Sequence, residues 1–189
     1  MIEKPIQNDY EEQYEKLQAL KKLKNNIGLF GRYCFPTAAK RATPPFHGEI
    51  YSHIGDNKVP RVLIAAPRGT AKSTAVSLFL PLHKAAFKRD TEDLFIVIIS
   101  ESQSQSVNFL SRIKYHLDHS QKFKEVFGDY SQRTAKRWTN SDIILANGTR
   151  IVAVGTGQRV RGFIEGDTRP NLVIVDDFES ELNAYTPEG

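Results

Sequence analysis

One short stretch of the chain combines a glycine, a lysine and a hydroxyl in an order that suits phosphate binding. It reads Ala66-Pro-Arg-Gly-Thr-Ala-Lys72-Ser73, and it follows an apolar run and opens a segment of helical composition. Such a loop can bind an anionic phosphate through backbone N–H groups, a helix N-terminus and a lysine, while the serine hydroxyl is a ligand for Mg²⁺. We call residues 66–73 the lysine loop. The alternative is an ordinary strand-to-helix turn with a solvent-exposed lysine.

The lysine loop departs from the common pattern G-x-x-x-x-G-K-[ST]. Ala66 and Ala71 stand where both glycines belong, and Gly69 is the only glycine inside the loop. Alanine can follow the loop's backbone path only where the path does not need φ and ψ values that are restricted to glycine. Ala66 and Ala71 are therefore compatible with such a loop only under this condition.

A pair of carboxylates follows an apolar run much later in the chain. Leu172–Val175 predicts a strand that delivers Asp176 and Asp177 to the C-terminal edge of a sheet, where ligands bind in open α/β folds. One aspartate there can hold a Mg²⁺ that bridges phosphates, and a further carboxylate can orient the attacking water. The alternative is a strand with an acidic turn. The lysine loop and the acidic pair together favour nucleotide binding.

Arginines accompany both motifs. Arg68 lies inside the lysine loop, and Arg159, Arg161 and Arg169 precede the second motif. Arginine stabilises the charge that develops on a transferring phosphoryl group, from the same subunit or from a neighbour. Structural ion pairing is the alternative for each of them.

The elements that must position these groups alternate between short apolar strands and helices. This order predicts an α/β fold with a mostly parallel sheet covered by helices on both faces. We expect strands at 62–66, 94–99 and 172–175, a hairpin of 143–145 with 150–154 around Asn147-Gly148, and helices at 9–25, 46–54, 71–87 with an interruption at Pro81, and 107–117. We expect the first helix to lie on the outside of a core.

Composition is that of one folded domain of 189 residues, with 40% hydrophobic and 25% charged residues. The single Cys34 excludes an intrachain disulfide, and we find neither a signal-peptide core nor an apolar run long enough to span a membrane. The net charge of +4 is unevenly spread. Residues 110–139, which we call the basic segment, carry seven basic and three acidic residues, whereas residues 171–189 carry five acidic residues and no basic one.

The chain resembles the ATPase domain of the large terminase subunit, the motor that packages DNA into tailed-phage and related capsids. Three stretches carry the resemblance: Phe46-His47 with Glu49-Ile50, which is similar to an adenine-side motif; Pro67–Ser73, which is similar to an arginine-bearing phosphate loop; and Arg161-Gly162 to Arg169-Pro170 with the acidic strand end that follows. Together they extend over about 130 of the 189 residues.

The resemblance implies roles for individual residues. Lys72 would contact the β and γ phosphates of ATP, Ser73 and Asp176 would hold Mg²⁺, and Arg68 would sense the γ-phosphate. The full ATP-binding set would be Phe46, His47, Pro67, Arg68, Gly69, Thr70, Ala71, Lys72, Ser73 and Thr74. Phe46 would stack on adenine, while His47 stands where many relatives have glutamine, with a plain surface histidine as the alternative.

Two catalytic assignments stay open at this level. The catalytic carboxylate is Asp177, which holds the expected position but is one methylene shorter than glutamate, or Glu179. The arginine offered to a neighbouring subunit is Arg161 or, as the alternative, Arg159.

The resemblance also implies a fold and an organisation. The fold would be a P-loop NTPase of the ASCE/RecA-like class, with residues 1–60 as a helical segment carrying the adenine-side motif and residues 61–189 as a partial ATPase core. We expect no nuclease domain, because the chain ends shortly after the acidic motif.

The implied setting is a homo-oligomeric ring in the host cytoplasm, docked transiently on the procapsid without a membrane. Its partners would be non-specifically bound double-stranded DNA, a portal protein and a small terminase subunit. DNA would contact the basic segment, for which a solvated helix face is the alternative. Two other functions stay open: a different P-loop translocase or helicase-like ATPase, and an ATP-binding assembly module with little hydrolysis.

Overall fold

A mixed five-stranded sheet organises the fold, with strand order β2-β3-β4-β1-β5. The computed structural model describes the backbone of residues 6–12 and all atoms of residues 13–40, 44–156 and 169–177. The strands are β1 (Phe95–Ser100), β2 (Arg137–Trp138), β3 (Asp142–Ile144), β4 (Arg150–Gly155) and β5 (Leu172–Val175). The helices are α1 (Ile6–Lys24), α2 (Ile27–Cys34), α3 (Phe46–Gly55), the π-helix η1 (Thr74–Phe79), α4 (Leu80–Ala86), α5 (Gln103–His119) and α6 (Gln121–Phe127).

The sheet has a parallel half and an antiparallel half. β1 lies between β4 and β5 and runs parallel to both, whereas β2, β3 and β4 are joined antiparallel. The predicted hairpin is confirmed: Ile144 pairs with Arg150, and Gly148 takes a φ of +83° in the turn. The expectation of an α/β fold is confirmed, while the mostly parallel sheet is corrected to a mixed one.

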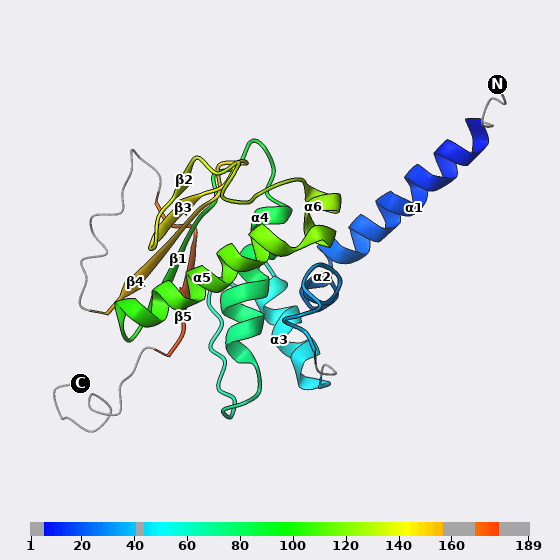
Figure 1. Ribbon diagram of the computed structural model, residues 1–189. Coiled ribbons are helices and arrows are strands. Elements are labelled where there is room, and N and C mark those ends of the chain that lie inside the picture. Colours follow the sequence, from blue (N-terminus) through cyan, green and yellow to red (C-terminus); the bar gives the residue numbers. More distant parts are fainter. Residues whose placement is uncertain (1–5, 41–43, 157–168, 178–189) are drawn as a thin grey trace, which may run out of the picture.

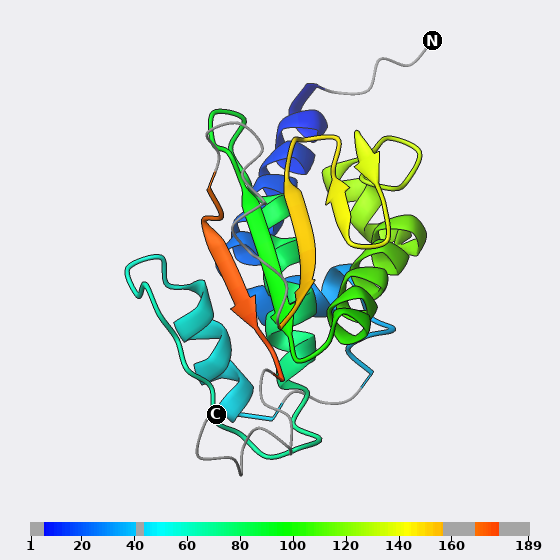
Figure 2. The same cartoon turned by 90° about the vertical axis from the view of Figure 1, so that its left-hand side faces the viewer.

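The described helices pack on one face of the sheet, which Figure 2 shows from the opposite side. Because side chains alternate along a strand, Ile96 and Ile98 of β1 enter the main core with helix residues such as Leu110, whereas Phe95 and Val97 belong to a separate small cluster on the other face. The expectation of helices on both faces is therefore not met within the described residues. No described helix has the length and apolar character that crossing a membrane requires.

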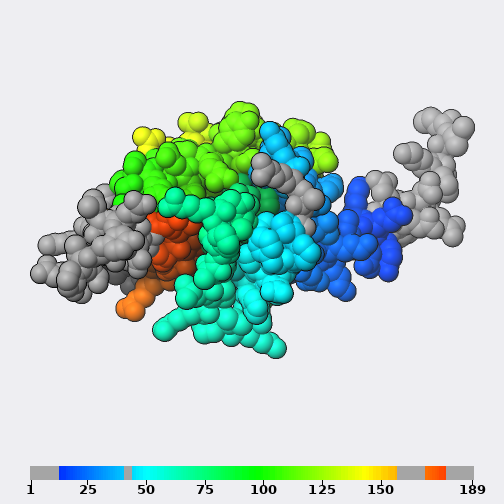
Figure 3. All heavy atoms as spheres, turned by 90° about the horizontal axis from the view of Figure 1, so that it is seen from below, coloured from blue at the N-terminus to red at the C-terminus, as the bar shows by residue number. Residues whose placement is uncertain are grey.

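The strand expected at residues 62–66 is not formed. These residues have no regular secondary structure and join no ladder, and Leu63 is 96% exposed. An apolar run becomes a strand only when a neighbouring strand accepts its backbone hydrogen bonds. Among the described residues, β5 pairs with β1 alone, so its outer edge is open. Atoms of β5 are visible at the molecular surface in Figure 3 (orange-red).

The N-terminal helices also differ from expectation. α1 is longer than predicted and projects from the body (Figure 1), with Tyr14 and Leu17 each 64% exposed, so that only its end, at Leu23, enters the core. α2 is not among the predicted helices; it is capped by the Asn26 side chain, which accepts a hydrogen bond from the N–H of Leu29. The short helix α6 was not predicted.

The helix expected at 71–87 contains a change of winding. Residues Thr74–Phe79 form a π turn in which the N–H of Leu80 donates to the carbonyl of Ala75, and the chain returns to α geometry at Leu80. Pro81 lacks an N–H and clashes with the carbonyl four residues earlier in a regular α-helix. The expected interruption is thus present, and it lies just before the proline. π turns often occur at functional sites.

His83 of α4 joins the end of α1 to the body. Its Nε2 donates to the carbonyls of Lys24 at 3.0 Å and Leu23 at 3.2 Å, so it satisfies carbonyls that the last turn of a helix leaves unpaired. The ring packs edge-on against Phe30. Burial, with smaller effects of nearby lysines, lowers the pKa of His83 from 6.5 to about 4, so the imidazole is neutral at pH 7.

Replacing this histidine tests its contribution to stability. The unfolded chain takes up the proton near pH 6.5 and the folded chain only near pH 4, so the contribution is complete above pH 6.5 and is lost as the pH falls toward 4. The full difference corresponds to about 3 kcal/mol. Urea unfolding measures the free energy of unfolding at pH 7.5 and at pH 4. The decrease between these two pH values should be smaller in His83→Gln than in the wild type. An equal loss in both proteins would contradict the assignment.

Candidate functional site

The carboxylate of Asp176 joins the two sequence motifs. It follows β5, where its N–H donates to the carbonyl of Ile99 at 2.9 Å and continues the ladder. The Ser73 hydroxyl at the end of the lysine loop donates to Oδ1 at 3.2 Å, and the hydroxyl of Ser77 in η1 donates to Oδ2 at 2.6 Å. Ser73 and Asp176, which the sequence assigned to one metal ion, are therefore adjacent in space.

The lysine loop is held by its own side chains. The ammonium of Lys72 donates to the carbonyls of Ala66 and, at 3.2 Å, Pro67, and the hydroxyl of Thr70 donates to Pro67 at 2.7 Å. Within the part of the chain that the structure describes, the backbone N–H groups of Gly69, Thr70 and Ala71 donate no hydrogen bond to the protein. Three such donors beside a lysine can bind an anion.

Ala71 adopts a left-handed backbone conformation, which glycine takes more readily than alanine. Its φ is +57°, in the left-handed region, while Gly69 has a φ of +80°. A Cβ in this region approaches the following carbonyl and costs about 1–2 kcal/mol. Ala66 is not among the residues with positive φ, and the left-handed region at Ala71 is strained for alanine but not restricted to glycine. The loop thus keeps the geometry of a glycine at a position that holds alanine.

Asp177 has a defined orientation at the same edge. Its φ is +49°, a conformation that aspartate tolerates better than most residues, and its carbonyl accepts the N–H of Glu101 at 2.9 Å. The side-chain amide of Gln105, in the first turn of α5, donates to Oδ2 of Asp177 at 3.2 Å. No sequence signal indicated Gln105. Ser77 could have been found, because it lies four residues after Ser73.

His47 connects α3 to the lysine loop. The residue is only 8% exposed, and its Nε2 lies 2.6 Å from the carbonyl of Thr70, so the proton of the ring is on Nε2 in this contact. The alternative of a plain surface histidine is therefore wrong. Phe46 is 38% exposed and packs edge-on against the His47 ring.

A cavity of about 450 Å³ opens beside the lysine loop. Its volume lies within the range of small-molecule sites. Phe46 does not line it. The walls come from α2, the stretch between α2 and α3, α3, the lysine loop and η1. The lining residues are Gly28, Arg32, Thr37, Ala38, Ala39, Lys40, Pro44, His47, Tyr51, Gly69, Thr70, Ala71, Thr74 and Phe79.

The arginines are only partly described. Arg68 and Arg169 are exposed, whereas Arg159 and Arg161 lie outside the described residues, as does Glu179. Another arginine, which the sequence did not single out for the site, contacts the residue after Ser73. Nη2 of Arg112, on α5, lies 3.4 Å from the hydroxyl of Thr74. A cation of the basic segment therefore lies beside the start of η1.

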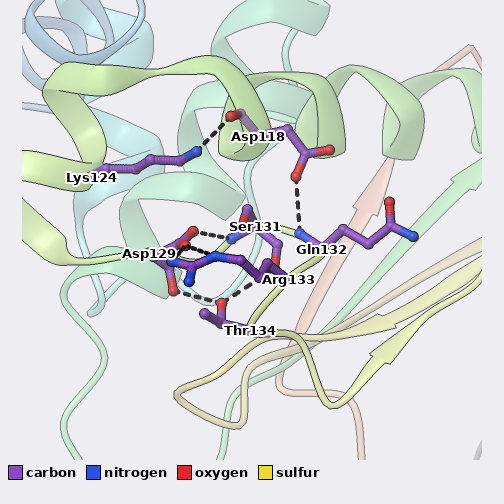
Figure 4. A network of polar contacts seen from close by, with 7 residues as sticks. All are labelled: Asp118, Lys124, Asp129, Ser131, Gln132, Arg133 and Thr134. Atoms are coloured by element: carbon purple, nitrogen blue, oxygen red, sulfur yellow. Dashed lines mark hydrogen bonds and ion pairs between the residues drawn. The ribbon is translucent and has the colours of Figure 1, made fainter.

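Other cations of the basic segment form contacts in or beside the loop between α6 and β2, which we call the α6–β2 loop (Figure 4). Arg133 bonds the carboxylate of Asp129 through Nε and Nη2, and the N–H of Ser131 donates to the other oxygen of that carboxylate. Hydrogen bonds from Ser131, followed by those from Arg133, hold the pKa of Asp129 well below its ordinary value. Lys124 donates to the carbonyl of Asp118. Arg133 and Lys124 therefore have structural partners within the protein.

The basic segment also contains aromatic residues, whose type predicts core positions rather than a base-stacking surface, and most of them lie in or against the core. Phe123 is fully buried, and Phe127, Tyr130 and Trp138 pack against the core, but Tyr115 is 56% exposed. The expectation is wrong for Tyr115 alone.

The donor atoms fit a magnesium ion. Ser73 and Asp176 offer a hydroxyl and a carboxylate oxygen, and Mg²⁺ prefers oxygen ligands with one or two carboxylates, the rest being phosphate and water. The described residues contain no cluster of three or more histidines, cysteines and acidic residues, which an all-protein metal cage would need.

Comparison of the chain with family models and with curated proteins finds no match. Inference about function therefore depends on the sequence motifs and on the geometry above.

Substitution of Ala71 by glycine tests the strain in the lysine loop. Glycine removes the steric cost of positive φ but adds entropy to the unfolded chain, so Ala71→Gly should raise the free energy of unfolding by about 0.5–1 kcal/mol. Ala65→Gly, at an exposed position not among those with positive φ, is the matched control and should lower it. Urea titration measures both, and destabilisation of both variants would show that Ala71 is not strained.

Proposed function

We propose that this protein is a Mg²⁺-dependent ATPase module. The observation that carries the proposal is the contact of Ser73 with Asp176, which joins the end of the lysine loop to the end of β5. In P-loop enzymes a serine or threonine after the loop lysine and an aspartate at a strand end hold one Mg²⁺ together. Two motifs far apart in the sequence thus meet as this chemistry requires.

The phosphates would lie over the lysine loop. The N–H groups of Gly69, Thr70 and Ala71 would donate to phosphate oxygens, and Lys72 would exchange its carbonyl partners for the β and γ phosphates. Pro67, Arg68 and Thr74 complete the proposed loop contacts. The neighbouring cavity of about 450 Å³ would receive the ribose and the base. Because His47 bonds the loop, its proposed role is to position the loop beside the base, and Phe46 supports His47.

Hydrolysis would use the acidic pair. Asp176 and Ser73 would hold Mg²⁺, which supplies charge neutralisation on the β and γ phosphates when bound. Asp177 would orient the attacking water, supported by its hydrogen bond from Gln105. Arg68 would contact the γ-phosphate, and Arg161 would be offered to a neighbouring subunit.

The proposed biological setting follows from the resemblance to large terminase subunits. ATP hydrolysis would drive double-stranded DNA into a viral capsid, within a ring that contacts a portal protein and a small terminase subunit in the host cytoplasm. In the basic segment, Arg112 lies beside the proposed nucleotide site, whereas Arg133 and Lys124 already bond groups in or beside the α6–β2 loop of Figure 4. We therefore place the proposed DNA contacts outside that loop.

Loss of the loop lysine tests the proposed function. Lys72→Ala should reduce phosphate release from ATP by about 100-fold or more, because it removes the positive charge that stabilises the transferring phosphoryl group. The measurement is phosphate release by the 189-residue chain, alone and with double-stranded DNA. Lys58→Ala, an exposed lysine in the turn after α3, is the matched control and should keep wild-type activity.

The outcomes separate the competing functions. Equal phosphate release by wild type and Lys72→Ala would reject the assignment of Lys72. Nucleotide binding by the wild type without hydrolysis, with or without DNA, would favour the ATP-binding assembly module. Strand separation by the active protein would favour the helicase-like alternative.

A pair of variants tests which carboxylate orients the water. Asp177→Asn should lower the rate of hydrolysis about 100-fold to 10,000-fold while nucleotide binding persists, since general-base and water-orienting groups contribute in this range. Glu179→Gln should keep most of the activity. Single-turnover hydrolysis and equilibrium binding of a fluorescent ATP analogue measure the two properties, and the reverse pattern would assign the role to Glu179.

A further inference from the structure

Ser77 is a buried hydroxyl that the proposed reaction does not use directly. It lies in η1, is 1% exposed, and donates to Oδ2 of Asp176 at 2.6 Å. Ser73, four residues earlier, donates to Oδ1 of the same carboxylate over the longer distance of 3.2 Å and is only partly buried. The two oxygens of Asp176 thus have partners of different character.

We propose that Ser77 is the positioning residue for the magnesium site, which fixes the carboxylate of Asp176 so that Oδ1 faces the metal together with Ser73. This inference rests on the proposed function and adds a residue that neither motif contains. Ser77 would act through Asp176, to which its hydroxyl is bonded, and not by contacting nucleotide or metal itself.

The geometry separates a permanent partner from an exchangeable one. The backbone of Asp176 is fixed by the bond of its N–H to Ile99, so the remaining freedom is rotation of the carboxylate. A short hydrogen bond from a buried hydroxyl to a carboxylate is stronger than a neutral one and stops that rotation. The longer bond from Ser73 is the weaker of the two, and Ser73 and Asp176 are the residues that would hold the ion.

The π turn supplies the hydroxyl. Ser77 lies within Thr74–Phe79, just before the return to α geometry ahead of Pro81. The helix that follows the lysine loop therefore presents two hydroxyls to one carboxylate, Ser73 from its first turn and Ser77 from the wider turn. Groups that orient metal ligands in this way usually change metal affinity about 10-fold to 100-fold when removed.

The experiment measures how strongly Mg²⁺ enhances nucleotide affinity. Dissociation constants of a fluorescent ATP analogue are determined in EDTA and in saturating Mg²⁺, and their ratio is the gain due to the metal. Ser77→Ala should lower this gain about 10-fold to 100-fold with the EDTA affinity unchanged within about twofold. Ser77→Thr, which keeps the hydroxyl, should retain the gain, a pattern that loss of packing alone does not produce.

Two further variants keep the test decisive. Ser77→Cys is nearly isosteric but a weak donor, so it should also lose the gain due to Mg²⁺. It supplies the test if Ser77→Ala does not fold. Ser106→Ala removes another buried serine, whose hydroxyl bonds the carbonyl of Gln103, and should behave as wild type. An unchanged gain in folded Ser77→Ala or Ser77→Cys, with a normal gain in the wild type, overturns the role of Ser77 alone. No Mg²⁺ gain in the wild type overturns the proposed function, and the role of Ser77 with it.

Discussion

The carboxylate of Asp176 is the group on which the candidate site depends. It lies at the end of a parallel strand, and hydrogen bonds from Ser73 and Ser77 attach it to the segment that follows the lysine loop. These bonds matter because residues 62–66 before the loop join no ladder that could fix it to the sheet. Within the described residues, the loop is held from the acidic strand end on one side and from His47 on the other.

Local strain marks the same region. Ala71 and Asp177 are the two non-glycine residues with positive φ in the described chain, and each lies within two residues of the Ser73–Asp176 contact. η1 begins soon after Ala71, so an uncommon backbone, a π turn and a partly buried carboxylate with two serine partners occur together. Such features persist only where surrounding contacts hold them, and they gather at functional sites. This clustering supports the proposed site independently of the motifs.

Charge along the chain is a weaker guide to function than its distribution in space. The basic segment suggested a DNA-binding surface, yet Arg133 is bonded to Asp129, Lys124 to a helix-end carbonyl, and Arg137 to Asp142. Lys114 lies over the ring of Trp138. Cations that are close in sequence thus stabilise different turns and strands, because helices and a hairpin direct them to different sides. Arg112 differs in reaching the proposed nucleotide site.

Sequence alone determined the α/β class, the hairpin around Asn147-Gly148, and the two motifs whose residues Ser73 and Asp176 meet, since these depend on periodicity, turn chemistry and residue type. Tertiary structure decided the rest. The apolar run at 62–66 has no strand partner, and apolar character cannot specify one. Ser77 and Gln105 reach the aspartates through the relative placement of η1, α5 and β5, because hydrogen bonds require distances that only packing sets.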